Sequence, residues 1–460
     1  MTPRFLIAAA HKSSGKTVIT TGLSRALSMR SLKVQTFKKG PDYIDPMWLG
    51  LASGRPCYNL DFNTMNEGEV RNLLSSRAAG ADIAVIESNK GLYDGVDLHG
   101  ADSNAAMAKL IKVPVVLVVD TTGTTRGIAP LLMGYQAFDA DVNIAGVILN
   151  KTGGARHEGK LRAAVEEYTD LPVLGAVGRS DDLEIGERHL GLTTPSETGM
   201  IQGLIDTLGH RLADSVDLDK LITIASSAPD LEFTPQTPVD KFAQGIRIGV
   251  ARDTAFGFYY PDDFEAFEAA GAELVFFDAI NDAHLPDIDG LFIGGGFPET
   301  AMEKLEANAS MRHEIKQEIA GGMPAYAECG GLMYLCETLE WNGKKHKMAG
   351  IIPGNAVMCE RPQGRGHTRL SASDDCLWRV EGGTIKAHEF HYAKVDNLPE
   401  NTKFGFDVQR GTGISGAHDG IIINNLMAGF CHMRNTDSNP WVSRFLRHVV
   451  AVKARKTPPE

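Results

Sequence analysis

The first 200 residues alternate short apolar runs with longer amphipathic stretches. Runs rich in Val, Ile, Leu and Ala are typical of buried strands, and the stretches between them have helical length and spacing. Strands that are apolar throughout and separated by helices indicate a parallel sheet covered on both faces. The expected strands are FLIAAA, KVQTF, IAVIES, VPVVLVVD, IAGVILN and LPVLGAVG.

The same alternation restarts after a polar stretch at residues 226–245 that contains three prolines and little periodicity. Such a composition is typical of a linker. Beyond it, IRIGVA, AELVFF, GLFIGGG and MPAYAEC predict further strands, followed by a strand-rich tail. We therefore expect two α/β domains, residues 1–225 and 246–460, each a mainly parallel sheet flanked by helices.

Composition narrows the class of protein. A chain of 460 residues with 43% hydrophobic and 23% charged positions is close to the average soluble globular protein, which excludes a disordered, collagen-like or coiled-coil chain. The net charge of −12 argues against nucleic acid or an anionic membrane as partner. No apolar segment is long enough to predict a membrane span. Six cysteines without a CxxC pair indicate reduced thiols and a cytoplasmic protein.

A candidate phosphate site lies at HKSSGKT, residues 11–17, between the first strand and a predicted helix. Backbone N–H groups and a helix N-terminus converge in such a loop and suit a polyphosphate. Lys16 would neutralise the β- and γ-phosphates, and the Thr17 hydroxyl would ligate magnesium. Ala10 stands where the usual pattern has its leading glycine. The alternative is an ordinary Ser-Gly helix entry with a solvated lysine.

Acidic residues follow several of the predicted strands. Asp42 and Asp45 lie on a turn after the second strand, Glu87 ends the third with Asp94 in the loop beyond, and Asp120 ends the next. Ligands of open parallel sheets bind at the carboxyl ends of the strands, where these carboxylates suit a magnesium-bound phosphate. Any one of the aspartates is also a common turn former.

A candidate nucleophile lies in PAYAECGGLMYL. Cys329 ends a short apolar strand and is followed by two glycines and a helical run, which predicts a strained elbow that exposes the thiol. The N–H of Gly330 and one from the glycine loop around Gly295 would hold an oxyanion. His432 is the expected base. The alternative, a buried structural cysteine, is kept for Cys336, Cys359, Cys376 and Cys431.

Two other segments carry candidate chemistry. His388 and His391 are three residues apart in a strand-like stretch and would face opposite sides, so a shared metal ion is not expected. Residues 361–369 hold three arginines, which fit either a binding loop for an anionic substrate or a solvated basic loop.

The motifs FKKGPDYIDP, GLYDG, GGGFPE, AECGG and HEFHY occur in the order found in the cobyrinic acid a,c-diamide synthase family, which the chain resembles over nearly its whole length. The resemblance implies a dethiobiotin synthetase-like ATPase domain followed by a class I glutamine amidotransferase domain. It also implies amidation of the a- and c-acetate carboxylates of a tetrapyrrole in cobalamin biosynthesis, with ATP, magnesium and glutamine, by a homodimer.

The resemblance further implies the chemistry of the two halves. ATP would phosphorylate a substrate carboxylate, and the acyl phosphate would accept ammonia that Cys329 releases from glutamine through a thioester. It assigns phosphate and nucleotide contacts to Gly15, Lys16, Thr17 and Asn150, magnesium to Thr17, Glu87 and Asp42, and substrate contacts to Tyr43, Asp45 and Asp94.

The sequence departs from the family pattern at two places besides the missing leading glycine of the phosphate loop. Ser88, Asn89 and Lys90 stand where glycine and small apolar residues are usual, which adds a charge beside the expected magnesium and leaves a different substrate open. Arg434 stands where many glutaminases have a carboxylate that orients the base. We therefore expect a Cys329–His432 dyad, and we expect Arg434 to disfavour protonated His432.

Alternatives remain open from the sequence. The same chemistry would also fit hydrogenobyrinic acid, sirohydrochlorin or sirohaem as substrate. Cobyric acid synthase, which amidates other side chains, has a similar glutaminase half. A third reading is a P-loop assembly ATPase fused to an inactive glutaminase-like module, which would release no glutamate from glutamine.

Overall fold

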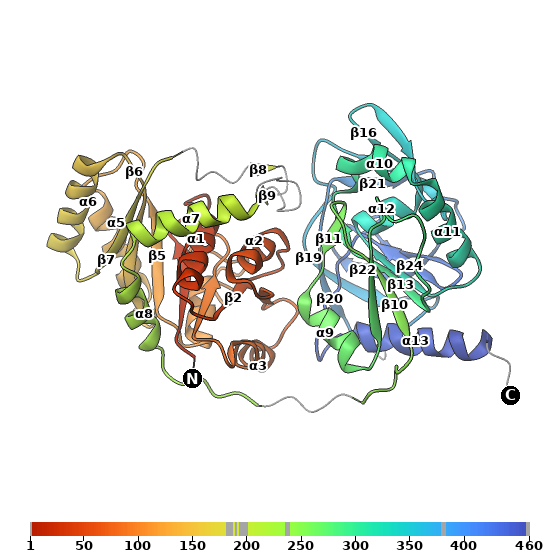
Figure 1. Cartoon of the computed structure of the whole chain (residues 1–460), viewed down its shortest axis with the longest axis horizontal. Coiled ribbons are helices and arrows are strands. Elements are labelled where there is room, and N and C mark those ends of the chain that lie inside the picture. The colour runs from red at the N-terminus through yellow and green to blue at the C-terminus, as the bar shows by residue number, and fades with distance from the viewer. Residues whose placement is uncertain are drawn as a thin grey trace. The chain divides into compact units, whose positions relative to one another are not determined.

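The computed structural model describes residues 2–180, 187–188, 191–192, 201–234, 240–378 and 383–456. The chain folds into two compact units, Met1–Gln236 and Thr237–Glu460 (Figure 1). The expected linker at 226–245 spans this boundary, and its residues 235–239 lie outside the described part.

The first unit is built on a parallel sheet of seven strands in the order β3-β2-β4-β1-β5-β6-β7. Its strands are β1 (Arg4–Ala9), β2 (Val34–Lys39), β3 (Tyr58–Leu60), β4 (Ile83–Glu87), β5 (Val115–Asp120), β6 (Ile144–Thr152) and β7 (Val173–Gly178). The six strands expected from the apolar runs are confirmed. The seventh, β3, has only three residues, too few to show a period in the sequence.

Helices cover both faces of this sheet, as expected of buried parallel strands. Leu6 and Ala8 share one hydrophobic core with apolar side chains of α3 to α6, and the alternate residues Phe5 and Ile7 are equally buried on the other side. The helices are α1 (Lys16–Met29), α2 (Ile44–Ser53), α3 (Glu67–Ala78), α4 (Asn104–Leu110), α5 (Ile128–Phe138), α6 (Ala155–Tyr168), α7 (Ile201–Ser215) and α8 (Leu218–Ser226). A two-stranded pair, β8 (Glu187–Arg188) and β9 (Gly191–Leu192), is also present.

Close packing of α1 against α7 fixes the helix that follows the phosphate loop. A Cβ added at Gly22 of α1 would lie 2.9 Å from the Leu208 carbonyl oxygen and 2.7 Å from a Leu212 methyl carbon. Only glycine lets the two helices, side by side in Figure 1, approach so closely.

The second unit contains a mixed sheet of nine strands in the order β12-β10-β13-β15-β24-β23-β22-β19-β20. The first five are parallel to their neighbours, and from β24 onward the pairing is antiparallel. The strands are β10 (Arg247–Ala251), β12 (Glu273–Phe277), β13 (Gly290–Ile293), β15 (Ala325–Glu328), β19 (Gly364–Ala372), β20 (Ile385–His391), β22 (Lys403–Arg410), β23 (His418–Ile423) and β24 (Leu426–Gly429).

Smaller elements complete this unit. A four-stranded sheet that the sequence did not predict consists of β16 (Cys336–Trp341), β17 (Lys344–Lys347), β18 (Ile352–Met358) and β21 (Ala393–Asp396), and β11 (Phe256–Phe258) pairs with β14 (Gly295–Gly296). Strands β16 and β17 of the four-stranded sheet are short and largely polar, so they lack the apolar runs from which strands were predicted. The helices are α9 (Pro261–Ala269), the 3-10 turn η3 (Pro298–Ala301), α10 (Met302–Ala307), α11 (Ala309–Ala320), α12 (Gly330–Leu335) and α13 (Trp441–Lys456).

An aromatic cluster holds strand β15 in place. The Tyr326 ring stacks on Phe292 of β13, with 5.6 Å between ring centroids, and contacts Trp378 and Trp441 at 4.9 and 5.0 Å. Large buried rings contribute strongly to core stability and adopt defined relative orientations. The residues that follow Tyr326 on this strand are therefore precisely positioned.

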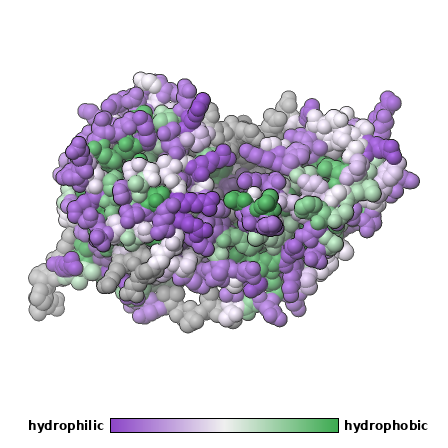
Figure 2. All heavy atoms as spheres, turned by 180° about the vertical axis from the view of Figure 1, so that it is seen from behind, coloured by the Kyte–Doolittle hydropathy of each residue, from purple (hydrophilic) through white to green (hydrophobic). Residues whose placement is uncertain are grey.

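The surface seen in Figure 2 is mainly hydrophilic, with apolar side chains gathered in smaller patches between the polar ones. Among the described residues, none of the helices combines the length and the apolar character needed to cross a membrane.

Candidate active sites

The phosphate loop has the conformation that the GKT motif predicts. Gly15 precedes helix α1 with φ of 83°, a left-handed conformation that glycine adopts without strain. Lys16 then begins the helix, and its Nζ donates to the Lys90 carbonyl oxygen at 2.6 Å. The loop is closed on its other side by Asn150, whose amide donates to the Ser14 carbonyl oxygen at 2.9 Å.

The Thr17 hydroxyl faces the carboxylates predicted to join it. It donates to Glu87 Oε1 at 3.0 Å and lies 3.3 Å from Asp45 Oδ2. Asp45 is 28 positions and Glu87 70 positions from Thr17 in the chain, and the parallel sheet brings all three to one edge. The structure therefore gathers Thr17, Glu87 and Asp45 as the strand-end argument expected.

An internal lysine that the sequence analysis did not single out lies at the centre of this group. Lys38 Nζ is 2.6 Å from Glu87 Oε1, forms a shorter contact with Asp45 Oδ2, and is 4.0 Å from Asp42 Oδ2. The Lys38 side chain is 3% exposed and Glu87 is fully buried. The sequence carries no clear signal for this role, since the two lysines that end β2 (VQTFKK) are seen to be buried only in the folded structure.

Burial and mutual charge set the protonation of this cluster. Burial disfavours the Lys38 ammonium, but the Asp45 and Glu87 carboxylates outweigh it and raise the pKa of Lys38. Burial, followed by the charge of Lys38, lowers the pKa of Lys16 to about 8. Burial and the charge of Asp45 raise the pKa of Asp42 to about 7. The site thus holds one lysine firmly charged and a second that titrates near neutrality.

The donor set fits a magnesium ion bound mainly by phosphate. Across the described parts of the chain, no three His, Cys, Asp or Glu side chains are grouped so as to hold a metal by themselves. Mg²⁺ normally uses only one or two carboxylates with water and substrate phosphates. Within the described residues, the buried Glu87 Oε2 has no hydrogen-bond partner, which leaves it available beside the Thr17 hydroxyl.

Other predicted site residues are held by the backbone around the loop. Asp42 Oδ1 accepts the N–H groups of Ile44 and Asp45 at 3.0 and 3.1 Å, so it caps the start of α2 rather than contacting Thr17. Asp94 Oδ2 accepts the Gly91 N–H at 3.0 Å. Tyr43, which directly precedes α2, is buried.

Two of the strand-end polar residues lie apart from the Thr17 group. Asp120 pairs with Lys151 at 2.9 Å, and the same ammonium donates to the Ser13 carbonyl oxygen at 3.1 Å. Asn150 is 7% exposed and packs so tightly on the loop that a Cβ at Gly15 would lie 2.4 Å from its amide nitrogen. Asn150 thus supports the loop backbone directly, and Asp120 does so through Lys151.

The unusual segment Ser88–Lys90 forms part of the loop's support. The Lys90 carbonyl oxygen accepts a hydrogen bond from the Lys16 ammonium, and Lys90 adopts a positive φ of 38°. The side-chain amide of Asn104 donates to the Asn89 carbonyl oxygen at 2.6 Å. The departure from the family pattern therefore lies against the phosphate site.

In the second unit, Cys329 occupies a sharp turn between β15 and α12. Its φ of 49° and ψ of −102° are strained for a residue other than glycine, as predicted for a nucleophile elbow. Its N–H donates to the Gly429 carbonyl oxygen at 2.7 Å. Cys329 is only 7% exposed, so the thiol is more enclosed than the sequence analysis expected.

The two glycine-rich segments pack directly on one another beside the thiol. A Cβ at Gly330 would lie 2.9 Å from the Gly296 nitrogen, and one at Gly331 would lie 2.3 Å from the Ile293 carbonyl oxygen. The predicted oxyanion residues Gly330 and Gly295 therefore belong to one compact backbone cluster, where only glycine fits.

His432 reaches this cluster from a distant part of the chain. It forms a hydrogen bond with Cys329, and a Cβ at Gly295 would lie 2.6 Å from its Cε1 atom. Its Nδ1 lies 3.2 Å from Glu328 Oε2, and both side chains are 3% exposed. The structure thus brings together the predicted nucleophile, base and oxyanion residues.

The expected dyad is wrong, because Glu328 places a carboxylate on the base. The expected effect of Arg434 is also wrong. Burial disfavours charged His432, but its hydrogen bonds with Cys329 and Glu328 outweigh burial and raise the pKa of His432 to about 10. Arg434 is paired with a carboxylate, since its Nη2 lies 2.8 Å from Asp262 Oδ2.

A second histidine covers the base. The rings of His388 and His432 are stacked, with centroids 5.0 Å apart and planes 15° from parallel. Their backbones exchange two hydrogen bonds, 2.7 and 3.3 Å long. His391, on the same strand, stacks instead on Phe430 at 3.9 Å. Burial and the charge of His432 lower the pKa of His388, so it remains a neutral support.

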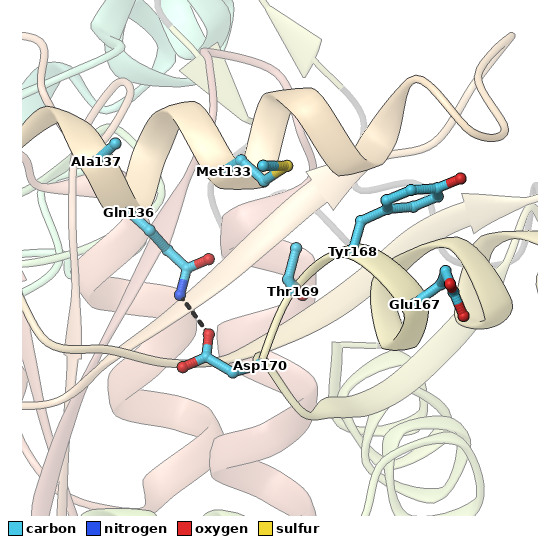
Figure 3. A pocket seen from close by; sticks show the side chains of 7 residues that line it. All are labelled: Met133, Gln136, Ala137, Glu167, Tyr168, Thr169 and Asp170. Carbon is cyan, nitrogen blue, oxygen red and sulfur yellow. Dashed lines mark hydrogen bonds between the residues drawn. The ribbon is translucent and has the colours of Figure 1, made fainter.

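A shallow surface pocket of about 600 Å³ lies in the first unit, away from its phosphate site (Figure 3). Helices α5 and α6 form its walls, and Gln136 donates to Asp170 across it at 2.7 Å. The pocket lies where these helices end, towards the amino ends of the strands, whereas ligands of such sheets bind at the carboxyl ends. Its lining residues are Met133, Gln136, Ala137, Glu167, Tyr168, Thr169 and Asp170.

Comparisons with known proteins agree with the geometry of both units. Residues 5–192 match the CobQ/CobB/MinD/ParA nucleotide binding domain, and residues 247–440 match the CobB/CobQ-like glutamine amidotransferase domain. These matches confirm the predicted fold class.

Full-length relatives share one name. The chain is 43% identical over 454 residues to the cobyrinate a,c-diamide synthase of Magnetococcus marinus, with 97% of each chain covered. It is 42% identical over 465 residues to that of Methanosarcina acetivorans, covering 94% of this chain and 92% of the relative. The match to the Dehalococcoides mccartyi protein is 38% over 457 residues, covering 97% and 98%. The predicted ligase is confirmed, and the chain belongs to the cobyrinate a,c-diamide synthase family.

Proposed function

We propose that this chain uses ATP and glutamine to convert the a- and c-acetate carboxylates of cobyrinic acid to primary amides. The observation that carries the proposal is the contact of Cys329 with His432 at a strand-to-helix elbow, in a chain that also holds a complete phosphate loop. The first chemistry supplies ammonia and the second activates a carboxylate. The names of the full-length relatives point to the substrate.

The first unit would carry out the activation. A substrate carboxylate oxygen attacks the γ-phosphorus of ATP, the bond to the β,γ-bridging oxygen breaks, and an acyl phosphate and ADP result. Lys16 and the backbone N–H groups of the loop neutralise the phosphates. A magnesium ion, held by Thr17 and Glu87, would supply further charge neutralisation on the phosphate oxygens. Buried Lys38 orients the Glu87 carboxylate, and its charge opposes the burial that raises the pKa of Glu87.

The second unit would supply nitrogen. The Cys329 sulfur attacks the glutamine amide carbon while His432 takes the thiol proton and returns it to the leaving ammonia. N–H groups of Gly330 and the loop at Gly295 hold the oxyanion. Water then attacks the thioester carbon with His432 as base, and glutamate leaves as the thiol is restored.

Further assignments belong to the same proposal. Residues 1–225 form the ATPase domain and 246–460 the glutaminase domain, joined by 226–245. Asn150 contacts adenine, Asp42 assists the magnesium site, and Tyr43, Asp45 and Asp94 contact the macrocycle. Their positions at the carboxyl edge of the sheet support these roles. The enzyme acts in the cytoplasm as a homodimer.

Mass spectrometry of the macrocycle tests the proposal. Purified protein, ATP, Mg²⁺ and glutamine are incubated with cobyrinic acid, hydrogenobyrinic acid, sirohydrochlorin or sirohaem. We expect cobyrinic acid to gain two amides, each replacing a hydroxyl by an amino group. Conversion of sirohydrochlorin or sirohaem instead of cobyrinic acid would show that this macrocycle is the substrate. It would also explain why Ser88–Lys90 differs from the family pattern. Glutamine consumption without any amidated macrocycle would contradict the proposal.

A further inference from the structure

The carboxylate of Glu328 contacts the base of the thiol site from the residue directly before the nucleophile. Its Oε2 lies 3.2 Å from His432 Nδ1, across 104 positions of the chain. A carboxylate at this position can orient the imidazole. Many glutaminases have such a carboxylate two residues after the base, where this chain has Arg434. We propose that Glu328 is the positioning residue of the glutaminase, fixing the tautomer of His432 so that its Nε2 faces Cys329. This inference rests on the proposed ammonia-producing role of the second unit.

The second oxygen of the same carboxylate is fixed independently. Glu328 Oε1 accepts the Met433 N–H at 2.8 Å and the Tyr326 hydroxyl at 2.6 Å. A carboxylate bound at one oxygen by two donors has little rotational freedom, so its other oxygen is aimed at His432. Because Tyr326 is itself held in the aromatic cluster, the whole arrangement is anchored in the core of the unit.

Geometry dictates which imidazole nitrogen meets the thiol. An ionised carboxylate only accepts hydrogen bonds, so Nδ1 of His432 must carry the proton that it donates to Glu328. The other nitrogen, Nε2, is then left to accept the proton of Cys329. Neutral imidazole is thereby held in the tautomer that a general base requires, the logic that the Ser-His-Asp triads share.

Other charged groups around the pair do not replace Glu328. His388 stacks on the imidazole face and stays neutral, and Arg434 is bound to Asp262. Cys329 and Glu328 together raise the pKa of His432, so both stabilise the imidazolium that forms when Nε2 takes the thiol proton. The titratable groups near His432 or Glu328 are Cys329, Tyr326, His388, Tyr259, Asp263 and Arg434.

A single isosteric substitution tests the inference. In Glu328→Gln, the side-chain oxygen keeps its bonds from Met433 and Tyr326, and the amide nitrogen then donates to His432 Nδ1. The imidazole must place its proton on Nε2, where it cannot accept one from Cys329. We expect glutamate release at neutral pH to fall on the order of 10,000-fold, as a wrong tautomer does in Ser-His-Asp triads. Ammonia-supported amidation should be unchanged.

The pH profile separates positioning from a merely structural role. A thiol forms its nucleophilic thiolate without a base when the solution is alkaline enough, so glutamate release by Glu328→Gln should recover part of its loss at alkaline pH. A variant with a damaged fold would show no such recovery. Glu337→Gln, at an exposed position on β16, is the matched control and should keep both the rate and the profile of the unaltered protein.

Alkylation of Cys329 supplies a readout that needs no macrocycle. Iodoacetamide modification, followed by peptide mass spectrometry, should slow at least tenfold at pH 7 in Glu328→Gln and remain unchanged in Glu337→Gln. Tyr326→Phe, which removes one of two donors to Oε1, should reduce glutamate release by a smaller factor of about three to ten. Unchanged alkylation and glutamate release in Glu328→Gln would overturn the inference.

Two further outcomes are also decisive. If Glu328→Gln loses activity with both nitrogen donors at every pH, glutamate release by Tyr326→Phe decides the question. Unchanged glutamate release in Tyr326→Phe overturns the inference. A partial loss of glutamate release, with ammonia-supported amidation retained, supports it. If alkylation slows as expected but no macrocycle is amidated by the unaltered protein, the role of Glu328 stands and the proposed ligase substrate fails.

Discussion

Lys38 Nζ lies 2.6 Å from Glu87 Oε1 at the carboxyl edge of the first sheet, and both side chains are almost completely buried. The same ammonium also contacts Asp45. The carboxylates best placed for a metal-bound phosphate are therefore held together by an internal cation. Without it, two negative charges would share a site that excludes water.

We predict that Lys38→Met destabilises the first unit by about 3–5 kcal/mol, because removing one partner leaves the buried Glu87 and Asp45 carboxylates uncompensated. Calorimetry of the full chain should show one unfolding transition shifted to lower temperature. Adding Glu87→Gln to this variant should restore part of the loss, since only one of the carboxylates then remains charged. A double variant less stable than Lys38→Met would contradict this account.

We predict that Cys329→Ala abolishes glutamate release but leaves amidation with concentrated ammonia intact, because the first unit keeps its own chemistry. Lys16→Ala should remove amidation with either nitrogen donor, since the phosphates lose their neutralising charge. Both are measured by amidated product at matched glutamine and ammonium concentrations. Equal loss with both donors in Cys329→Ala would refute the separation of the two chemistries.

Local features of both sites could be predicted from the sequence. The phosphate loop is set by a short motif between a strand and a helix, and the Cys329 elbow by a thiol followed by two glycines. Each is a property of consecutive residues. The strand ends that carry Glu87 and Asp45 were also predictable, because parallel strands of a covered sheet place their carboxyl ends at one edge.

Contacts between distant residues were not predictable in the same way. Glu328 does not follow from the sequence, because the usual position of the orienting carboxylate is two residues after His432, where Arg434 stands. Which residue meets the imidazole depends on the parallel pairing of β15 with β24, which aligns Glu328 with Gly429. Lys38 was overlooked because a lysine next to a turn is normally solvated, and its burial is decided only by the packing around β2.

We predict that ATP binding takes up a proton at alkaline pH. Burial and the charge of Lys38 lower the pKa of Lys16 to about 8, so above that pH the free protein carries mostly neutral Lys16. Bound phosphates favour the charged form, and protonation then accompanies binding. The affinity for ATP should therefore fall as the pH rises above 8.

Calorimetric titration at pH 8.5 in two buffers of different ionisation enthalpy measures this proton uptake. Lys16→Met should bind ATP weakly and without uptake. Lys39→Met is the matched control, since burial also lowers the pKa of Lys39 to about 8, yet its ammonium donates to the Asp102 carbonyl oxygen instead of pointing at the loop. Uptake lost in Lys39→Met and kept in Lys16→Met would reverse the assignment.

We predict that Gly331→Ala disables the thiol site while leaving the phosphate site intact. The new Cβ would lie 2.3 Å from the Ile293 carbonyl oxygen, so the Cys329 elbow must move away from the glycine loop. A displacement of about 1 Å costs on the order of 100-fold in rate when reacting groups must be aligned. Glutamate release should fall by that factor, and ammonia-supported amidation should persist. Gly159→Ala, where a Cβ on helix α6 meets nothing within 4 Å, is the control and should leave both activities unchanged. Full glutaminase activity in Gly331→Ala would show that the close contact of the two glycine segments is not what positions the nucleophile.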